Sequence, residues 1–309
     1  MSETPATGAP ARRRGRVADR PRLLGWLFLG PTLLYIFGLV GMPLVLSITY
    51  SLTNVTVTAT DFGWRGLDHY RAVTLSQTFW TAFKNTFIIA IGSQVVVAVF
   101  SLVLALALAR RFPGKWFVRL LILLPFVAPI SLGSIGWLWM FDSIYSIINW
   151  TLQHWGILGP GQWLYWLGEP HLALLSIILV QIWRTLPLAT VIVMAGLGSI
   201  PQDIHDAAQM DGASVWRHHT RITIPLLTPI VMVAVLFGLV FTFSDMVVIF
   251  VLTRGGPFDS THNLASWAFF AGIQGGDLGE GAAISLFLFP LLALTAIAML
   301  RVARKAEVT

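Results

Sequence analysis

The stretch DAAQMDGASVWRHHTRITIPL, from Asp206 to Leu226, is a polar segment in an otherwise apolar sequence. The whole chain of 309 residues is 56% hydrophobic and only 11% charged, whereas about a quarter of the residues of a soluble domain are charged. Several of its apolar runs have the length that crosses a lipid bilayer. The composition therefore predicts an all-α integral membrane protein, in which the quoted stretch is a loop exposed to water.

Six apolar segments are near the length that a helix needs to cross about 30 Å of hydrocarbon. They cover residues 24–46, 85–108, 117–140, 172–197, 226–252 and 282–302. We therefore expect a transmembrane domain over residues 24–305, followed by a short C-terminal tail at 306–309. Residues 1–23 are rich in Ala, Pro, Gly and Arg without apolar periodicity, so we expect them to form a disordered basic cytoplasmic tail.

The Lys and Arg residues gather in four segments that alternate with segments poor in them. Fifteen of the 20 lie within residues 12–22, 110–119, 217–221 and 301–305. Because cytoplasmic loops carry an excess of Lys and Arg, both termini and the quoted stretch are predicted to be cytoplasmic. Short basic clusters beside apolar segments are typical of such topology signals rather than of a nucleic-acid-binding face, so no nucleic acid is expected as a partner.

The quoted stretch and the residues before it have the pattern of two short helices joined by a turn. Ser199 is suited to cap the first helix, and Gly212 stands where a left-handed C-terminal cap would fall. Ser214 is suited to cap a second short helix, and Pro225 then opens the fifth span. These features predict a helix–turn–helix at about residues 198–224, lying across the cytoplasmic face of the membrane.

Two adjacent alanines of this stretch, Ala207 and Ala208, are expected to give the first helix a smooth side that another backbone can approach. With Asp206, Gly212 and the run Ile222-x-Ile224-Pro225, they resemble the EAA loop of importer-type ABC permeases. The resemblance implies a coupling helix that sits in a cleft of a separate ATPase subunit. Asp206 stands where the family usually has glutamate. The aspartate keeps the negative charge, but its shorter side chain does not reach as far. The coupling residues that the resemblance implies are Asp206, Ala207, Ala208, Asp211, Gly212 and Pro225.

Other stretches are similar to the carbohydrate-uptake permeases of the maltose-transporter type. They include GLDHYRAV from Gly66, LLPFVAPI from Leu123 and VLTRGGPFDST from Val251, the last of which resembles the first of two permease subunits. The resemblance implies import of a sugar or polyol, such as trehalose, maltose, another oligosaccharide or a glycerol-like polyol, across the bacterial cytoplasmic membrane. Implied partners are a homologous second permease, two copies of an ABC ATPase, an extracytoplasmic substrate-binding protein and membrane lipid. The chain itself would hold no cofactor, because ATP and Mg²⁺ bind to the ATPase.

Polar residues within the predicted spans are candidates for contact with substrate, because a polar group facing hydrocarbon is costly and such residues turn toward the bundle interior or a cavity. Hydroxyl and amide groups both donate and accept hydrogen bonds, which suits a neutral polyhydroxyl ligand. Ser and Thr also bond to carbonyls of their own helix, and Arg184 with Asp245 could be a structural ion pair. Pro125, Pro129 and Pro187 are expected to bend or break their helices. The candidates are Ser131, Ser134, Gln181, Arg184, Thr185, Thr242 and Asp245.

Two other classes of function remain as alternatives. An ion-coupled secondary transporter would need acidic residues in the middle of the membrane, for which Asp245 is the one candidate. A membrane-bound enzyme would need paired carboxylates, a metal cluster or a phosphate-binding glycine motif, and the sequence has none of these. His205, His218 and His219 lie in or beside the predicted loop without acidic neighbours in the arrangement of a metal site, and no metal is expected.

Overall fold

The computed structural model describes residues 21–58, 63–110 and 112–307, and this part of the chain is nearly all helical. Its only pairings of β type are two isolated bridges, Thr53–Trp64 and Thr56–Asp277. The prediction of an all-α fold is confirmed. Of the predicted tail at residues 1–23, residues 1–20 lie outside the described residues. At the other end of the chain, helix α15 continues to Glu307, past the predicted end of the transmembrane domain at residue 305.

The chain divides into two compact units between Thr49 and Tyr50. The first contains α1 (Pro21–Ile36), the π-helix η2 (Phe37–Gly41) and most of α2 (Met42–Ser51). Together these form one apolar helical stretch over Gly25–Ser51. Its most apolar 18 residues have a mean hydropathy of 2.0, and none of them is buried. The first predicted span is therefore a helix, and it extends five residues beyond the predicted end at residue 46.

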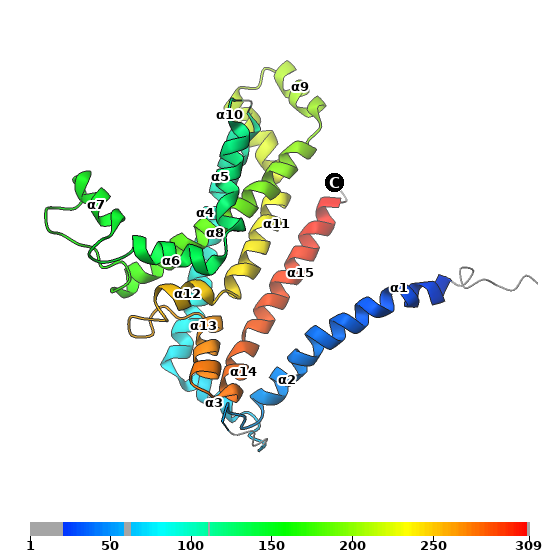
Figure 1. The fold of residues 1–309 in the computed structure, drawn as a ribbon. Helices are drawn as coiled ribbons and strands as arrows, with labels where there is room; N and C mark the ends of the chain where they lie inside the picture. Colours follow the sequence, from blue (N-terminus) through cyan, green and yellow to red (C-terminus); the bar gives the residue numbers. More distant parts are fainter. Residues whose placement is uncertain (1–20, 59–62, 111, 308–309) are drawn as a thin grey trace, which may run out of the picture. The chain divides into compact units, whose positions relative to one another are not determined.

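Four long helical segments form the bundle of the second unit (Figure 1). Helix α4 (Gln77–Ala109) packs along α8 (Pro170–Ser199), and α11 (Ile224–Phe243) contacts both of them as well as α15 (Leu288–Glu307). The core between α4, α8 and α11 consists of small and β-branched side chains together with one leucine, which bring the helices close. Its buried members are Val97, Ala105, Ala189, Val193, Leu227 and Ala234.

The predicted fifth span, 226–252, has the wrong bounds at both ends. The short helix α10 (Val215–His218) and the π-helix η3 (His219–Thr223) run directly into α11, so one helix covers Val215–Phe243. The wider π-turn ends at Thr223, two residues before Pro225, and helps the helix accommodate a residue that has no N–H to donate. The chain then leaves the helix at Ser244, and a separate helix, α12 (Val247–Leu252), begins after Asp245.

The predicted third span, 117–140, is not one continuous helix. It consists of α5 (Lys115–Val127) and α6 (Ile130–Met140), which meet at 98°. Ala128, the residue before Pro129, has an extended backbone (φ −65°, ψ 140°), because the proline ring excludes the helical conformation there. The predicted effect of Pro129 is confirmed, whereas α5 and α8 continue through Pro125 and Pro187 without a break. The described chain thus has five helices long enough to span a membrane, or six if α5 and α6 count as one span.

Shorter helices complete the second unit. They are α3 (Asp68–Leu75), α7 (Ile147–His154), α9 (Gln202–Met210), α13 (Leu264–Phe269) with the π-helix η4 (Phe270–Gln274), and α14 (Leu278–Leu286). Helix α6 packs on α12, and α14 packs on α3 and α13. Helices α9 and α10 lie at the end of the bundle opposite α3 and α14 (Figure 1).

Candidate functional site

The turn after α9 is built by the backbone around Gly212. Gly212 has φ +66°, and its N–H donates to the Gln209 carbonyl at 3.0 Å, while the Ala213 N–H donates to the Ala208 carbonyl, also at 3.0 Å. This pair of bonds is the Schellman motif that ends a helix with a left-handed residue. A Cβ at Gly212 would meet no atom within 4 Å. The predicted left-handed cap at Gly212 is confirmed, and it rests on backbone conformation alone.

The two predicted N-caps have different outcomes. Ser214 caps α10, because its side chain accepts from the Arg217 N–H at 3.4 Å, as the sequence predicts. Ser199 does not cap α9, because it is the last residue of α8 and donates to the Gly196 carbonyl at 2.8 Å. Pro201 precedes α9 instead, without a side-chain cap.

The alanine pair does not form a smooth exposed side. Ala208 is buried at 5% exposure, whereas Ala207 is exposed, because neighbouring residues on a helix point about 100° apart. The exposed side of the loop instead presents large apolar side chains: Met210 is 88% exposed and Trp216 is 79% exposed. Sequence reasoning missed both Met210 and Trp216. For Met210 there was a signal, because the spacing of Ile204, Ala207 and Met210 places these three residues on one helix face. Asp206 and Asp211 are also exposed, and Asp206 accepts a hydrogen bond from Gln202 at 3.0 Å.

A second candidate site lies inside the bundle, around the carboxylate of Asp245. Arg184 Nη1 donates to one carboxylate oxygen at 2.8 Å, and Gln181 Nε2 donates to the other at 2.5 Å. The Val248 N–H donates to the second oxygen at 3.3 Å, so Asp245 also caps α12. Asp245 is only 6% exposed. The predicted proximity of Arg184 and Asp245 is confirmed, and each carboxylate oxygen has a donor.

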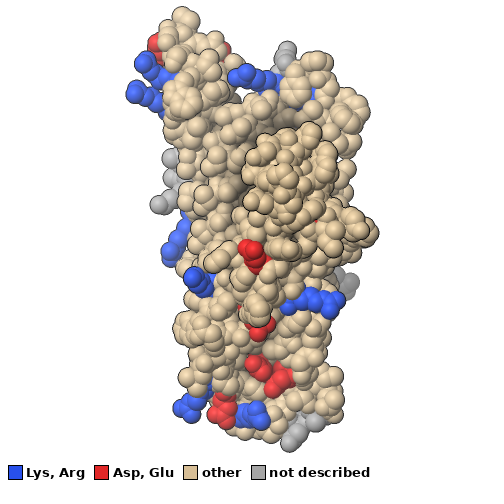
Figure 2. Space-filling view, turned by 90° about the vertical axis from the view of Figure 1, so that its left-hand side faces the viewer, with Lys and Arg blue, Asp and Glu red and all other residues tan. Residues whose placement is uncertain are grey.

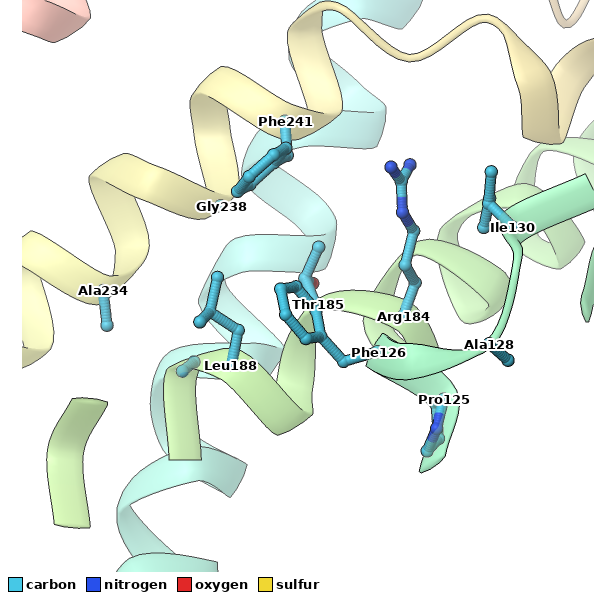
Figure 3. Close-up of a pocket in the computed structure, with 11 residues that line it drawn as sticks. Pro125, Phe126, Ala128, Ile130, Arg184, Thr185, Leu188, Ala234, Gly238 and Phe241 are labelled. Carbon is cyan, nitrogen blue, oxygen red and sulfur yellow. The ribbon is translucent and has the colours of Figure 1, made fainter. Parts of the chain in front are cut away.

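The Arg184 side chain also reaches a cavity of about 210 Å³ between α8, α11 and the break between α5 and α6. In Figure 3, Arg184 rises from α8 into the space between Ile130 and Phe241. Most of the wall is apolar, so the guanidinium and the Thr185 hydroxyl provide its polar side-chain groups. The Arg184 side chain is 22% exposed, whereas that of Asp245 is 3% exposed. The Arg184 side of the ion pair is thus open to the cavity, whereas the Asp245 carboxylate is closed off from it.

A buried amide joins the three central helices beside this cavity. Gln94 Nε2 on α4 lies 3.4 Å from the hydroxyls of Thr185 on α8 and Thr242 on α11. A Cβ on Gly238 would overlap the Gln94 amide, so the glycine makes room for it. Thr185 and Thr242 donate to carbonyls of their own helices, those of Gln181 and Gly238. Within the described chain, Gln94 Oε1 and Gln181 Oε1 are buried acceptors without a partner.

The two serine candidates on α6 belong to neither group. Ser131 is exposed. Ser134 is fully buried, and its hydroxyl has no hydrogen-bond partner among the residues that the structure describes. Thus the structure brings together Gln181, Arg184 and Asp245, and places Thr185 and Thr242 around Gln94.

Sequence reasoning also missed a network that holds the loop after α12. Asn85 Nδ2 on α4 donates to the carbonyls of Ser260 (2.6 Å) and His262 (3.0 Å), and Asn263 Nδ2 donates to the backbone carbonyl of Asp245 at 2.8 Å. Burial lowers the pKa of His262, although Asp259 acts in the opposite direction. An asparagine within the apolar second span was the signal that could have located this network.

No cluster of three or more His, Cys, Asp or Glu side chains that could hold a metal ion occurs in the part of the chain that was described.

Three comparisons with known proteins agree with this arrangement. Residues 98–308 match the family described as binding-protein-dependent transport system inner membrane component. The trehalose/maltose transport system permease protein MalF of Thermococcus litoralis is 32% identical over 285 residues, covering 92% of this chain and 95% of the relative. The trehalose transport system permease protein SugA of Mycobacterium tuberculosis is 27% identical, covering 96% and 93%. A bacterial alginate ABC transporter, solved with a periplasmic protein that binds an alginate pentasaccharide, has the same fold: TM-score 0.75, 20% identity, 93% and 95% coverage.

Proposed function

The chain belongs to the family of binding-protein-dependent transport system inner membrane components, and on this basis we propose that it is the permease subunit that carries a sugar or polyol through an ABC importer. It is a multi-pass inner membrane protein. In this family ATP hydrolysis resides on a separate subunit, so the ion-coupled alternative is not supported. The relatives whose names include trehalose and maltose support a carbohydrate substrate.

The observation that supports this proposal is the exposed helix α9 with its Gly212 turn, at the end of the bundle that we propose to be cytoplasmic. We propose that the ATPase contacts the apolar side chains of Met210 and Trp216 together with the carboxylates of Asp206 and Asp211. Exposed apolar side chains rimmed by charges are typical of a protein-binding surface. Ala208 would support the loop from inside. Pro225, at the start of α11, would pass the movement of the loop to the span.

For the substrate pathway, we propose the polar group around Asp245 and the cavity beside it. Because Asp245 neutralises Arg184, the remaining N–H groups of the guanidinium suit hydroxyl oxygens without favouring a charged ligand. Thr185 on α8 lines the same cavity, and the buried Gln181 on α8 and Thr242 on α11 are proposed to support this polar group from behind. Ser131 on α6, which starts at the cavity wall, is proposed to face the pathway when a partner subunit completes it, and the buried Ser134 lies one turn further along the same helix.

The proposed assembly contains a homologous second permease, two copies of an ABC ATPase and an extracytoplasmic substrate-binding protein. Both termini would be cytoplasmic. Exposed apolar side chains along α4, α5 and α6, such as Phe100, Leu121 and Leu132, are available for lipid or for the second permease.

Reconstitution in proteoliposomes tests the proposal. The substrate-binding protein encoded nearest to the gene would first be screened by thermal shift against trehalose, maltose, longer oligosaccharides and glycerol-like polyols. Uptake of the stabilising ligand would then be measured with the partner subunits present. We expect uptake that requires ATP and the binding protein and that persists when proton and sodium gradients are collapsed. Uptake driven by an ion gradient without ATP would contradict the proposal.

A further inference from the structure

A groove of about 1100 Å³ opens between the end of α4 and the α9–α10 loop. One part of its wall is apolar and comes from α4, with Val103 and Leu106. The other part carries Arg110 and the three histidines His205, His218 and His219. Among the described residues of the wall, these four are the only ones with titratable side chains, and all are basic. We refer to this feature as the α4–α9 groove.

The histidines of the groove form a compact stack. His205 Nδ1 and His218 Nε2 are 2.8 Å apart, and their rings are nearly parallel with centroids 5.0 Å apart. The rings of His218 and His219 lie 5.7 Å apart. The nitrogen Nδ1 of His219 is buried without a hydrogen-bond partner among the described residues. Burial, followed by the neighbouring His218, Arg110 and His205, lowers the pKa of His219. An anionic oxygen in the groove balances the charge of Arg110 and accepts hydrogen bonds from its guanidinium and from a ring N–H of His219.

The position of the groove indicates where that anion comes from. Arg110 directly follows α4, one of the long apolar helices, and therefore lies where a span leaves the hydrocarbon. Figure 2 shows Lys and Arg at the end of the molecule that carries α9 and α10 as well as further along this face, whereas most Asp and Glu of this face lie away from that end. Basic pockets between spans on the cytoplasmic side are suited to anionic lipid headgroups. A free phosphate would use only the basic part of the wall, whereas a lipid uses both parts.

We propose that the α4–α9 groove binds an anionic phospholipid, with its phosphate against Arg110 and His219 and an acyl chain along Val103 and Leu106. The inference rests on the proposed cytoplasmic position of the loop, but not on transport. Because His205 belongs to α9, a lipid bound here contacts the same helix whose outer side is proposed to receive the ATPase. The groove would thus link the lipid composition of the membrane to the position of α9.

The test uses the full chain in nanodiscs that contain equal parts of phosphatidylglycerol and phosphatidylcholine. The protein is released from the nanodiscs in a native mass spectrometer, and the lipid molecules that remain bound to it are counted. We expect retained phosphatidylglycerol to exceed phosphatidylcholine about fivefold, the effect of one basic residue near an anionic surface. Arg110→Gln with His219→Gln is expected to bring the ratio close to one. Arg221→Gln, which changes an exposed arginine outside the groove wall, is the matched control and is expected to keep the ratio. A ratio near one in the unchanged chain would overturn the proposal.

A second measurement leaves the groove charges intact, in case the double variant does not fold. The chain has no cysteine, so a single fluorophore can be placed in the groove at Gln209→Cys and, as control, on the outside of α9 at Asp203→Cys. Brominated phosphatidylglycerol is expected to quench the groove label more than brominated phosphatidylcholine does, with no such preference at the control. Equal quenching by both lipids would overturn the proposal. Loss of the preference for phosphatidylglycerol on adding inorganic phosphate would also overturn the proposal, because it would assign the site to the free anion. Shielding of the groove label by the partner subunits alone, without added lipid, would overturn it as well.

Discussion

Gly212 and Gly238 show how differently the two candidate sites are built. Gly212 in the α9–α10 loop has a left-handed backbone and open space around it, whereas Gly238 lies in α11 at a position where an added Cβ would overlap the Gln94 amide. The first glycine is needed for a backbone angle and the second for room. The loop therefore depends on local backbone conformation and presents its side chains outward, while the bundle interior depends on side chains from three helices meeting closely. Substitutions should separate these two kinds of dependence.

The largest effect is expected in the bundle interior, at the ion pair. Asp245→Asn leaves the Arg184 guanidinium without its counter-charge, and we expect a loss of about 3 kcal/mol of unfolding free energy, the lower end for breaking a buried pair because Arg184 is partly exposed. Thermal and denaturant unfolding of the purified chain measures it. In a double-mutant cycle with Arg184→Gln, the two changes should couple by about 0.5–3 kcal/mol. Strictly additive losses would show that the contact contributes nothing.

Gly238→Ala should have the next largest effect. The added methyl group overlaps the Gln94 amide, and overpacking of this kind costs about 1–3 kcal/mol. Combining it with Gln94→Ala should recover much of the loss, because the shorter side chain frees the space. The matched control is Gly198→Ala in α8, a helical glycine with no neighbour within 4 Å of the new Cβ. If Gly238→Ala and Gly198→Ala were equally stable in the same unfolding assay, the close contact at Gln94 would be refuted.

Gly212 should behave in the opposite way, with little effect on the stability of the spans. A left-handed conformation costs about 1–2 kcal/mol for residues other than glycine, and Asn tolerates it better than a β-branched residue. We therefore expect Gly212→Val to insert at normal levels but to lose the ATPase on co-purification and to lose substrate-stimulated ATP hydrolysis in liposomes. Gly212→Asn should retain most of both. Equal behaviour of the two variants would mean that the turn does not position α9.

Most features that depend on neighbouring residues in the chain could be predicted from the sequence. The Gly212 turn, the Ser214 cap and the break at Pro129 all follow from the backbone preferences of single residues. Ser199 was misassigned because α8 continues through it, so its hydroxyl bonds to its own helix. The start of the fifth span was placed too late, because a proline usually marks a helix start and the π-turn before Pro225 has no clear sequence pattern.

Features that depend on packing between helices were predicted only in part. The pairing of Arg184 with Asp245 could be inferred, because charges in a membrane have few available partners. The role of Gln94 as the amide between three helices could not, since it depends on Gly238 lying opposite, 144 residues later in the chain. The burial of Ala208 likewise depends on how α9 rests on the bundle, so the sequence pattern did not separate it from the exposed Ala207.

We propose that the ATPase subunit binds α9 on the cytoplasmic side of the membrane, and labelling of single cysteines can test both parts of this proposal. On the cysteine-free chain, Met210→Cys and Tyr145→Cys place one thiol each at positions that are 88% and 87% exposed. We predict that a membrane-impermeant thiol reagent applied to sealed inside-out vesicles labels Met210→Cys, and that adding the ATPase subunit slows this labelling strongly. Tyr145→Cys, before α7, should be labelled only from the other side and should not respond to the ATPase. Labelling of Met210→Cys that is unchanged by the bound ATPase, or that occurs from the outside of the cell, would contradict the account.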